Sequence, residues 1–254
     1  MNNAFYIGAA ALRTYQTANE GTASNVANIN TDQYKRVSVS FAEMVGEPAA
    51  EGSAGAAAAG ALMGVAVRAQ DRVFTPGELR QSGNPMDVAV VGEGLFELAG
   101  PGGQSLLWRG GTLRVNADGY LAAPNGMPLR ALIQVPQEAR ELSIAADGRV
   151  RARVDGQALP VELGQIELTL ATDTRALRSS ADGLFRAGDD AELVRAHPGE
   201  NGLGVLQQGS VETSNVKLSD ELVNLMLQQR AFAANARIVQ VGDELMGLVT
   251  GLKR

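Results

Sequence analysis

The 254-residue chain has no cysteine and few aromatic residues, which make up only 4% of it. Without cysteine, neither a disulfide nor a thiolate metal site can form. The cores must therefore be packed by valine, leucine and alanine. The one histidine, His197, lies between Ala196 and Pro198 in a loop-like stretch, and a metal site needs several ligands. We expect its side chain to be solvated, and we assign no metal.

The chain also lacks an excess of positive charge and a long apolar run. Its formal net charge is -6 at pH 7, whereas nucleic acids and anionic membranes select for lysine and arginine. No segment approaches the roughly 20 apolar residues of a membrane span. Residues 5–12 are mildly apolar, but no basic residue precedes them, and Arg13 and Gln16 follow. A cleaved signal peptide is therefore not indicated. We expect no nucleic-acid partner, no direct membrane insertion, and a chain that is cytoplasmic or exported by another route.

Several motifs resemble catalytic or phosphate-binding sites, but the secondary structure and residues around them do not fit such sites. Gly92-Glu93-Gly94 lies between two predicted strands and does not open a helix, so it cannot cradle a phosphate as a glycine-rich loop does. Ser105 and the pair Ser179-Ser180 have no histidine nearby to act as a base. We therefore predict that the protein is not an enzyme and uses no cofactor.

The two ends of the chain are predicted to be helical, over residues 1–35 and 211–250. We expect the first helix to begin at Asn2 or Asn3 and to run to about Ala27. Apolar or small residues recur with alternating steps of four and three, which keeps one stripe of a helix facing a partner helix. The N-terminal stripe is Ala4, Ile7, Ala11, Thr14, Ala18, Gly21 and Asn25. The C-terminal stripe is Leu218, Leu222, Leu225, Gln229, Phe232, Ala236, Val239, Asp243 and Met246.

The middle of the chain reads as antiparallel β structure. Short runs with period-two alternation begin at Val65 and continue to Leu170. Asx-Gly dipeptides, which supply the positive φ angles of tight hairpin turns, separate the runs. They are Asp118-Gly119, Asn125-Gly126, Asp147-Gly148, Asp155-Gly156 and Asp182-Gly183. Residues 47–60 are rich in alanine and glycine, and this composition is typical of a linker.

Three separated blocks resemble the bacterial flagellar rod and hook protein family. The first, Ser24-Asn25-Val26-Ala27-Asn28-Ile29-Asn30-Thr31 with Tyr34-Lys35-Arg36, is similar to the family signature Asn-Asn-Leu-Ala-Asn-x-x-Thr-x-Gly-Phe-Lys. The second consists of three separate pieces, Gly83-Asn84-Pro85-Met86-Asp87-Val88-Ala89-Val90, Gly94-Leu95-Phe96 and Asp118-Gly119-Tyr120-Leu121. The third runs from Gly209-Ser210-Val211-Glu212-Thr213-Ser214-Asn215-Val216 to Gln229-Arg230-Ala231-Phe232. The blocks are colinear with the family and cover nearly the whole chain.

The chain departs from the family pattern at Ser24, where the first Asn is usual, at Gln33, where Gly is usual, and at Leu95, where Phe is usual. Gln33 matters most, because glycine can adopt backbone angles that glutamine disfavours. The departure leaves open the path of the chain as it leaves the first helix.

The resemblance implies an α+β fold. The N- and C-terminal helices pair as a coiled coil, and a central antiparallel β domain and an Ala/Gly-rich linker lie between them in the sequence. The expected domains are a terminal-helix assembly domain of residues 1–35 and 211–254, a linker or extended segment of 36–79, and a β domain of 80–210. The expected subunit-assembly residues are Ile7, Ala11, Thr14, Ala18, Asn25, Asn28, Leu218, Leu222, Leu225, Gln229, Phe232, Ala236, Val239 and Met246.

As a function, the resemblance implies a structural subunit of the flagellar basal-body rod, which crosses the periplasm and is needed for motility. Its expected partners are other copies of itself, other rod and hook proteins, the flagellar type III export apparatus and the surrounding ring proteins. The third block resembles a distal rod component, whereas Asn3-Ala4-Phe5-Tyr6 resembles a proximal one.

Two other classes of protein remain open from the residues alone. One is a secreted or periplasmic carbohydrate-active β domain with a coiled-coil oligomerisation segment, and the other is an adhesin or pilin-like fibre. The absence of a signal peptide counts against both, and one Trp and four Tyr offer few platforms for a sugar.

Overall fold

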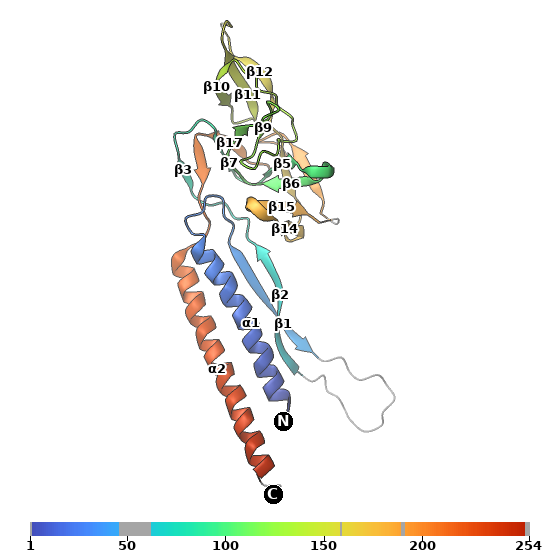
Figure 1. Cartoon of the computed structure of the whole chain (residues 1–254), viewed down its shortest axis with the longest axis vertical. Helices are drawn as coiled ribbons and strands as arrows, with labels where there is room; N and C mark the ends of the chain where they lie inside the picture. The colour runs from blue at the N-terminus through green and yellow to red at the C-terminus, as the bar shows by residue number, and fades with distance from the viewer. Residues whose placement is uncertain (1, 46–61, 158, 189–190, 252–254) are drawn as a thin grey trace, which may run out of the picture. The chain divides into compact units, whose positions relative to one another are not determined.

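A computed structural model describes residues 2–45, 62–157, 159–188 and 191–251, and they form two compact units. Unit 1 takes residues 1–27, 37–73 and 217–254, and unit 2 takes residues 28–36 and 74–216. Unit 1 carries the N- and C-terminal helices, and the described regular elements of unit 2 are short antiparallel strands and 3-10 turns joined by loops (Figure 1). The predicted α+β class is therefore confirmed. The predicted linker at residues 47–60 lies within the stretch 46–61, outside the described residues.

Unit 1 contains two helices and one β-hairpin. Its elements are α1 (Asn2–Ala27), β1 (Val37–Val45), β2 (Leu62–Arg72) and α2 (Leu218–Gly251). The two helices run side by side in opposite directions, and the hairpin lies along α1 (Figure 1). Strands β1 and β2 are antiparallel, with a bulge between Ser40 and Phe41. The bounds of α1 match those predicted from the sequence.

One side of α1 packs against the hairpin. Thr14 donates a hydrogen bond through Oγ1 to the Val65 carbonyl at 2.9 Å. A Cβ atom at Gly21 would lie 3.0 Å from Val39 Cγ2, so only glycine fits without a shift of its neighbour. The buried Asn25 accepts from Val37 N at 2.8 Å and donates to Val37 O at 2.9 Å, which satisfies both backbone groups where β1 begins.

A neighbouring side of α1 packs against α2. A Cβ atom at Gly8 would lie only 2.6 Å from Val239 Cγ2, so glycine lets the two helices approach closely. Thr22 and Gln228 exchange hydrogen bonds of 3.1–3.2 Å across the pair. The predicted small-residue stripe of α1 is thus shared between two partners. Its members Thr14, Gly21 and Asn25 contact the hairpin, whereas the sequence had predicted one helix as the only partner.

The broad helical segments predicted over residues 1–35 and 211–250 extend too far at their inner ends, although the narrower prediction for α1 is right. Residues 28–36 follow α1 without helix, and Val211 and Glu212 belong to a strand. The hydrogen bond from Thr31 N to Asn28 O closes a turn just after α1. Before α2, Thr213, Ser214 and Asn215 favour backbone-capping conformations over helix. The apolar heptad pattern supports a helix only from Leu218 onwards.

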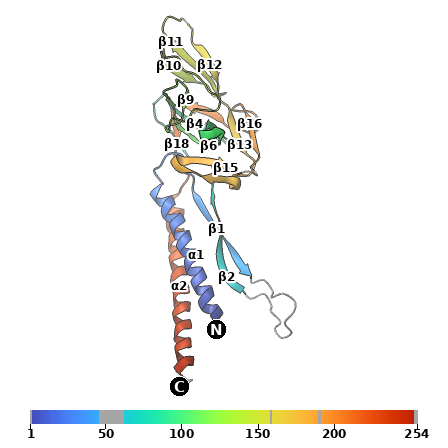
Figure 2. The ribbon, with the colours of Figure 1, turned by 45° about the vertical axis from the view of Figure 1, so that its right-hand side comes forward.

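Unit 2 consists of short strands in several antiparallel sheets (Figure 2). The six-stranded sheet has the order β14 (Leu177–Ser179), β15 (Leu184–Ala187), β6 (Ser105–Trp108), β5 (Leu95–Ala99), β13 (Leu168–Ala171), β16 (Leu193–Ala196). One three-stranded sheet has the order β10 (Ala139–Ile144), β11 (Arg149–Val154), β12 (Val161–Gln165). Another has the order β17 (Val205–Gln208), β4 (Asp87–Val91), β7 (Gly110–Thr112). The two-stranded sheets pair β18 (Ser210–Glu212) with β3 (Leu79–Gln81) and β8 (Arg114–Val115) with β9 (Leu121–Ala122). Three 3-10 turns are η1 (Pro101–Gly103), η2 (Thr174–Ala176) and η3 (Ala181–Gly183).

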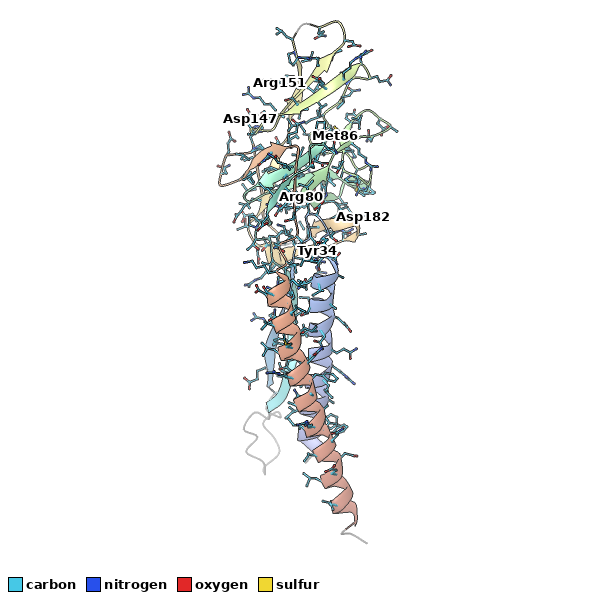
Figure 3. All side chains as sticks on the ribbon, turned by 90° about the vertical axis from the view of Figure 1, so that its left-hand side faces the viewer. Tyr34, Arg80, Met86, Asp147, Arg151 and Asp182 are labelled. Carbon is cyan, nitrogen blue, oxygen red and sulfur yellow. The ribbon has the colours of Figure 1, made fainter. Side chains whose placement is uncertain are left out.

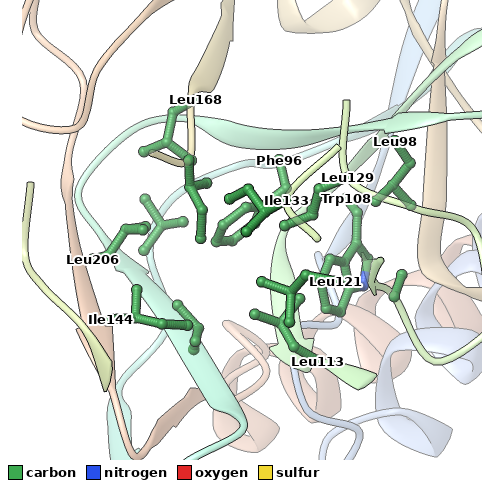
Figure 4. Packing of buried hydrophobic residues seen from close by; sticks show 14 of the residues in the cluster. Phe96, Leu98, Trp108, Leu113, Leu121, Leu129, Ile133, Ile144, Leu168 and Leu206 are labelled. Carbon is green, nitrogen blue, oxygen red and sulfur yellow. The ribbon is translucent and has the colours of Figure 1, made fainter. Parts of the chain in front are cut away.

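The main core of unit 2 lies among these sheets, and Figure 4 shows its packing. Phe96 and Trp108 stack at a tilt with ring centroids 5.7 Å apart, and branched aliphatic side chains surround them. The core therefore depends on valine, leucine and isoleucine around two aromatic rings, in agreement with the aromatic-poor composition. A smaller cluster around Leu107 and Phe185 packs on the other face of the six-stranded sheet.

Gln33, the main departure from the family pattern, has the backbone conformation that its usual glycine would adopt. Its φ is +63°, in the left-handed region that costs a non-glycine residue about 1–2 kcal/mol. Its N–H donates to the Glu212 carbonyl at 2.7 Å, which holds the segment after α1 against the strand before α2.

Candidate assembly surface

The most prominent feature of unit 1 is the large number of apolar side chains that α2 exposes. Side chains project along the length of this helix (Figure 3). The large apolar residues of α2 that are at least 40% exposed are Leu218, Leu222, Val223, Met226, Leu227, Phe232, Ile238, Val241, Leu245, Met246 and Leu248. A soluble monomer rarely exposes a continuous apolar surface of this size, and such surfaces mark protein contacts.

Part of this surface forms a second stripe at coiled-coil spacing, which we call the outer stripe. Its members are Val223, Leu227, Ala234, Ile238, Val241, Leu245 and Leu248. They follow one another at steps of four, seven, four, three, four and three, as the seam of a coiled coil does. Gln228 and Val239, which face α1, lie on a different side of α2. The helix therefore has one side that packs within the chain and another that is free for a partner.

None of the residues predicted to assemble subunits belongs to the outer stripe, and they differ among themselves in exposure. On α1, Ala11, Thr14, Ala18 and Asn25 are buried, Ile7 is half-buried, and Asn28 is half-buried in the turn that follows. On α2, Leu225, Ala236 and Val239 are half-buried, whereas Leu218, Leu222, Gln229, Phe232 and Met246 are exposed. The structure thus brings the α1 residues together within one chain. Of the predicted α2 residues, it leaves five open to contact other molecules.

Unit 2 contains a buried charge cluster centred on Glu212, which is 1% exposed. Its Oε1 accepts from Lys35 Nζ at 2.6 Å and from Gly77 N at 2.7 Å. Its Oε2 accepts from Arg109 Nε at 2.6 Å. Lys35 Nζ also donates to the Thr75 carbonyl at 3.0 Å. A carboxylate and two cations are thus held together out of water with their hydrogen bonds satisfied.

Arg109 joins this cluster to the turn between β4 and β5. Its Nη1 donates to Gly94 O at 2.6 Å, and its Nη2 donates to Gly92 O at 2.6 Å and to Val90 O at 3.2 Å. The Gly92-Glu93-Gly94 motif therefore serves as a turn whose carbonyls bind a guanidinium. This agrees with the sequence argument against a phosphate-binding loop.

Burial and charge act in opposite directions on the ionisation of the cluster. Burial alone raises the pKa of the Glu212 carboxyl, but the charges of Arg109 and Lys35 and the hydrogen bonds outweigh it and lower that pKa. Burial lowers the pKa of the Lys35 ammonium, and the attraction of Glu212 offsets this only in part. The carboxylate is therefore held in its charged form.

The sequence analysis did not find this cluster. Lys35 and Glu212 each lie in a block that resembles the flagellar family, but 177 residues separate them and no spacing rule pairs them. Arg109 lies outside all three blocks. Only the tertiary fold shows that these residues meet.

A second cluster in unit 2 surrounds Glu97. Arg195 Nε donates to Glu97 Oε2 at 2.6 Å, and Arg130 Nη1 donates to Oε1 at 2.9 Å. Burial tends to raise the pKa of the Glu97 carboxyl, but the hydrogen bond from Arg195 and the charges of both arginines lower it from 4.5 to about 2. The cluster ties β5 to β16, which lie on opposite sides of β13 in one sheet.

This lowered pKa predicts an acid-dependent stability. Because the folded pKa lies below the ordinary value, the stabilisation is complete above about pH 4.5 and is lost as the pH falls from 4.5 towards 2. We expect the difference in the free energy of unfolding between the wild type and Glu97→Gln to shrink over this interval, as measured by urea unfolding at a series of pH values. A difference that stays constant down to pH 2 would contradict the assignment.

Among the residues that the structure describes, no group of three or more His, Asp or Glu side chains is placed to hold a metal ion. A search of the described helices likewise finds none that is long and apolar enough to cross a membrane.

Comparison with known proteins supports the reading as an assembly subunit. Residues 207–252 match the family model of the C-terminal region of flagellar basal body rod FlgEFG proteins, and residues 89–152 match the D1 domain of flagellar hook proteins FlgE/F/G. The first match covers β18 and α2, and the second covers the centre of unit 2.

Curated relatives match over nearly the whole chain. The flagellar basal-body rod protein FlgG of Agrobacterium fabrum is 31% identical, with 97% of this chain and 98% of the relative covered. The FlgG of Bacillus subtilis is 30% identical over the full length of both, and that of Buchnera aphidicola from Acyrthosiphon pisum is 31% identical over 88% and 89%. These names agree with the resemblance to the flagellar rod and hook family, and they favour neither an enzyme nor a carbohydrate-active domain. The chain belongs to the flagellar basal-body rod protein family.

Proposed function

We propose that this rod subunit polymerises through unit 1, with the outer stripe of α2 packing against unit 1 of another copy. The observation that carries the proposal is the exposure of the stripe, where Leu227 is 59% and Leu248 65% open to solvent. Burying each such side chain stabilises an assembly by about 1.5–3 kcal/mol. Several of them along one helix are enough to drive association once subunits meet.

A different apolar surface of unit 1 is a suitable partner for the outer stripe. Phe5 and Tyr6 are both exposed on α1, and we call this pair the aromatic patch. The rings of Phe5 and Tyr6 lie edge to face at 6.2 Å. Because the patch and the stripe are not the same surface, a contact between them is heterologous and can repeat without closing. Such contacts build an open helical filament, which is the form that a rod requires.

The exposed residues of the predicted assembly set belong to the same proposal. Phe232 and Met246 lie seven residues before and after Val239, on the side of α2 that faces α1, and Leu218, Leu222 and Gln229 lie beside that side. A neighbouring helix can cover the parts of this side that α1 leaves exposed. The buried residues of α1, such as Ala11 and Ala18, shape unit 1 so that the neighbour finds a fixed surface.

The basal-body rod is the location that the family assignment supports, with other rod and hook proteins as partners. The finer features are part of our proposal. They are export through the flagellar type III apparatus without a cleaved signal, contact with the surrounding ring proteins, and a linker role for the Ala/Gly-rich residues 47–60, which follow β1 and precede β2 in the sequence.

Cross-linking tests the proposed contact directly, because the chain has no cysteine of its own. We expect basal bodies built from a mixture of Tyr6→Cys and Val241→Cys subunits to give a cross-linked dimer with a bismaleimide reagent. Arg151→Cys, on the exposed face of β11, replaces Val241→Cys in the control mixture. If the control mixture cross-links as well as the test mixture, or if only the control does, the proposed contact is wrong.

A further inference from the structure

The edge of the six-stranded sheet in unit 2 carries two arginines directly opposite each other. Arg178 lies on the edge strand β14 and pairs with Arg186 on β15. A backbone hydrogen bond from Ser180 N to Leu184 O at 2.8 Å, two residues along, helps to fix this register. Residues directly opposite in an antiparallel pair project from the same face of the sheet. The two cationic side chains therefore start from neighbouring positions on one surface.

Elsewhere in unit 2 a cross-strand arginine is matched with a carboxylate. In the sheet of β10, β11 and β12, Arg153 is opposite Glu141, and their charged groups lie 3.5 Å apart. Arg178 and Arg186 are both exposed, and within the described part of the chain neither of them forms an ion pair. Like charges directly opposite each other destabilise a sheet. The free chain therefore carries a repulsion that a bound anion would remove.

We propose that Arg178 and Arg186 together bind a carboxylate of a second copy of this chain. The inference rests on the proposed assembly of copies into a rod, but it uses an exposed surface of unit 2 and not the outer stripe of α2. A guanidinium presents its N–H donors in a planar fork that matches a carboxylate. The chain has 28 Asp and Glu against 22 Lys and Arg, so copies that pack together bring an excess of carboxylates with them. Binding a carboxylate to unpaired cations of a neighbour lowers the repulsion between copies.

The surroundings of the pair favour the binding of an anion. Leu106 is directly opposite Arg186 on β6, is 5% exposed and belongs to the main core. One side of the pair is therefore protein and not water. Opposite charges attract more strongly beside such a medium of low dielectric constant than in open water. A carboxylate that covers this pair is therefore held more firmly than one beside two fully solvated arginines.

Unfolding of the free chain tests whether the repulsion is present. Arg186→Gln removes one of the two like charges, so we expect it to raise the urea midpoint of unfolding at low salt, measured by the fluorescence of Trp108 in unit 2. The increase should vanish at about 1 M salt, where the screening length is about 3 Å. Arg114→Gln is the matched control, because Arg114 is exposed on β8 but is opposite Ala122. A midpoint that Arg186→Gln does not raise above that of the control would show that the pair has no unpaired charge to offer.

Carbodiimide coupling identifies the bound group in the rod, because this reagent joins an ammonium group directly to a carboxylate in contact with it. Arg186→Lys keeps the positive charge and supplies the ammonium group. In basal bodies that contain this variant, we expect a cross-linked dimer in which position 186 of one copy is joined to an Asp or Glu of another, as identified by mass spectrometry. Arg114→Lys is the control and should give severalfold less dimer. As little dimer as in the control, or a link formed only within one chain, would overturn the inference.

The coupling result is independent of the proposed contact through α2. If position 186 gives the dimer while Tyr6→Cys and Val241→Cys subunits fail to cross-link, the contact of the outer stripe is wrong and the arginine pair still binds a neighbour. If the cysteine variants cross-link and position 186 gives no dimer, only the role of the arginine pair is wrong.

Discussion

Replacing Glu212 by Ala is expected to lower the free energy of unfolding of unit 2 by about 3–5 kcal/mol. The change leaves the side chains of Lys35 and Arg109 buried without the carboxylate that binds both of them. It also leaves Gly77 N without its acceptor. Chemical denaturation reports the loss through the fluorescence of the one tryptophan, Trp108, which is buried in unit 2 next to Arg109.

Glu162→Ala provides the comparison, because Glu162 also pairs with an arginine in unit 2. Its partner Arg151 lies 3.9 Å away, and both side chains are about half exposed. Exposed pairs contribute about 0–1 kcal/mol, so this variant should unfold almost as the wild type does. Similar losses in the two variants would show that burial of the Glu212 cluster has no special effect on stability.

Replacing Val241 by Asp is expected to abolish rod assembly and swimming while leaving the free subunit folded. Val241 is 53% exposed in the chain, so the aspartate meets water before assembly and costs little. In the proposed filament the same position is buried, and an unpaired charge there costs several kcal/mol at every repeat. Swimming in a strain that lacks the wild-type gene, with circular dichroism as the folding assay, measures both expectations.

The neighbouring Gln240 serves as the control for charge alone. It is exposed and lies outside the outer stripe, so Gln240→Asp adds the same charge one residue away. We expect cells with this variant to swim. Loss of swimming in both strains would point to the charge of α2 in general, and normal swimming with Val241→Asp would exclude the outer stripe as an assembly surface.

The elements with local causes could be predicted from the sequence. The helix α1 covers Asn2–Ala27, as the sequence predicted. The five Asx-Gly pairs that predicted turns all have glycine with positive φ, and four of them join paired strands. Short-range rules succeed here because each turn is closed by residues only a few positions apart.

The sequence did not predict the features that depend on contacts between residues far apart in the chain. The order of the six-stranded sheet places β13 beside β5 and β16, and no local pattern specifies these neighbours. The small stripe of α1 was assigned to one helix because the periodicity of a helix shows that a face is buried without showing what covers it. The Glu212 cluster was missed for the same reason, since its three charges come together only when unit 2 folds.

The shared packing of α1 sets the order in which the chain can fold. Residues 74–216 of unit 2 are continuous in sequence, and they need only the short segment 28–36 to complete them. Unit 1 instead joins the first and last parts of the chain, and the Thr22–Gln228 bond closes a loop of 206 residues. Contacts at such separation form slowly, because the entropy of closing the loop is lost before the contact forms. When the chain emerges with its N-terminus first, α1 is therefore available without α2 until almost the whole chain has emerged. Unit 1 is complete only when the C-terminal helix has emerged too.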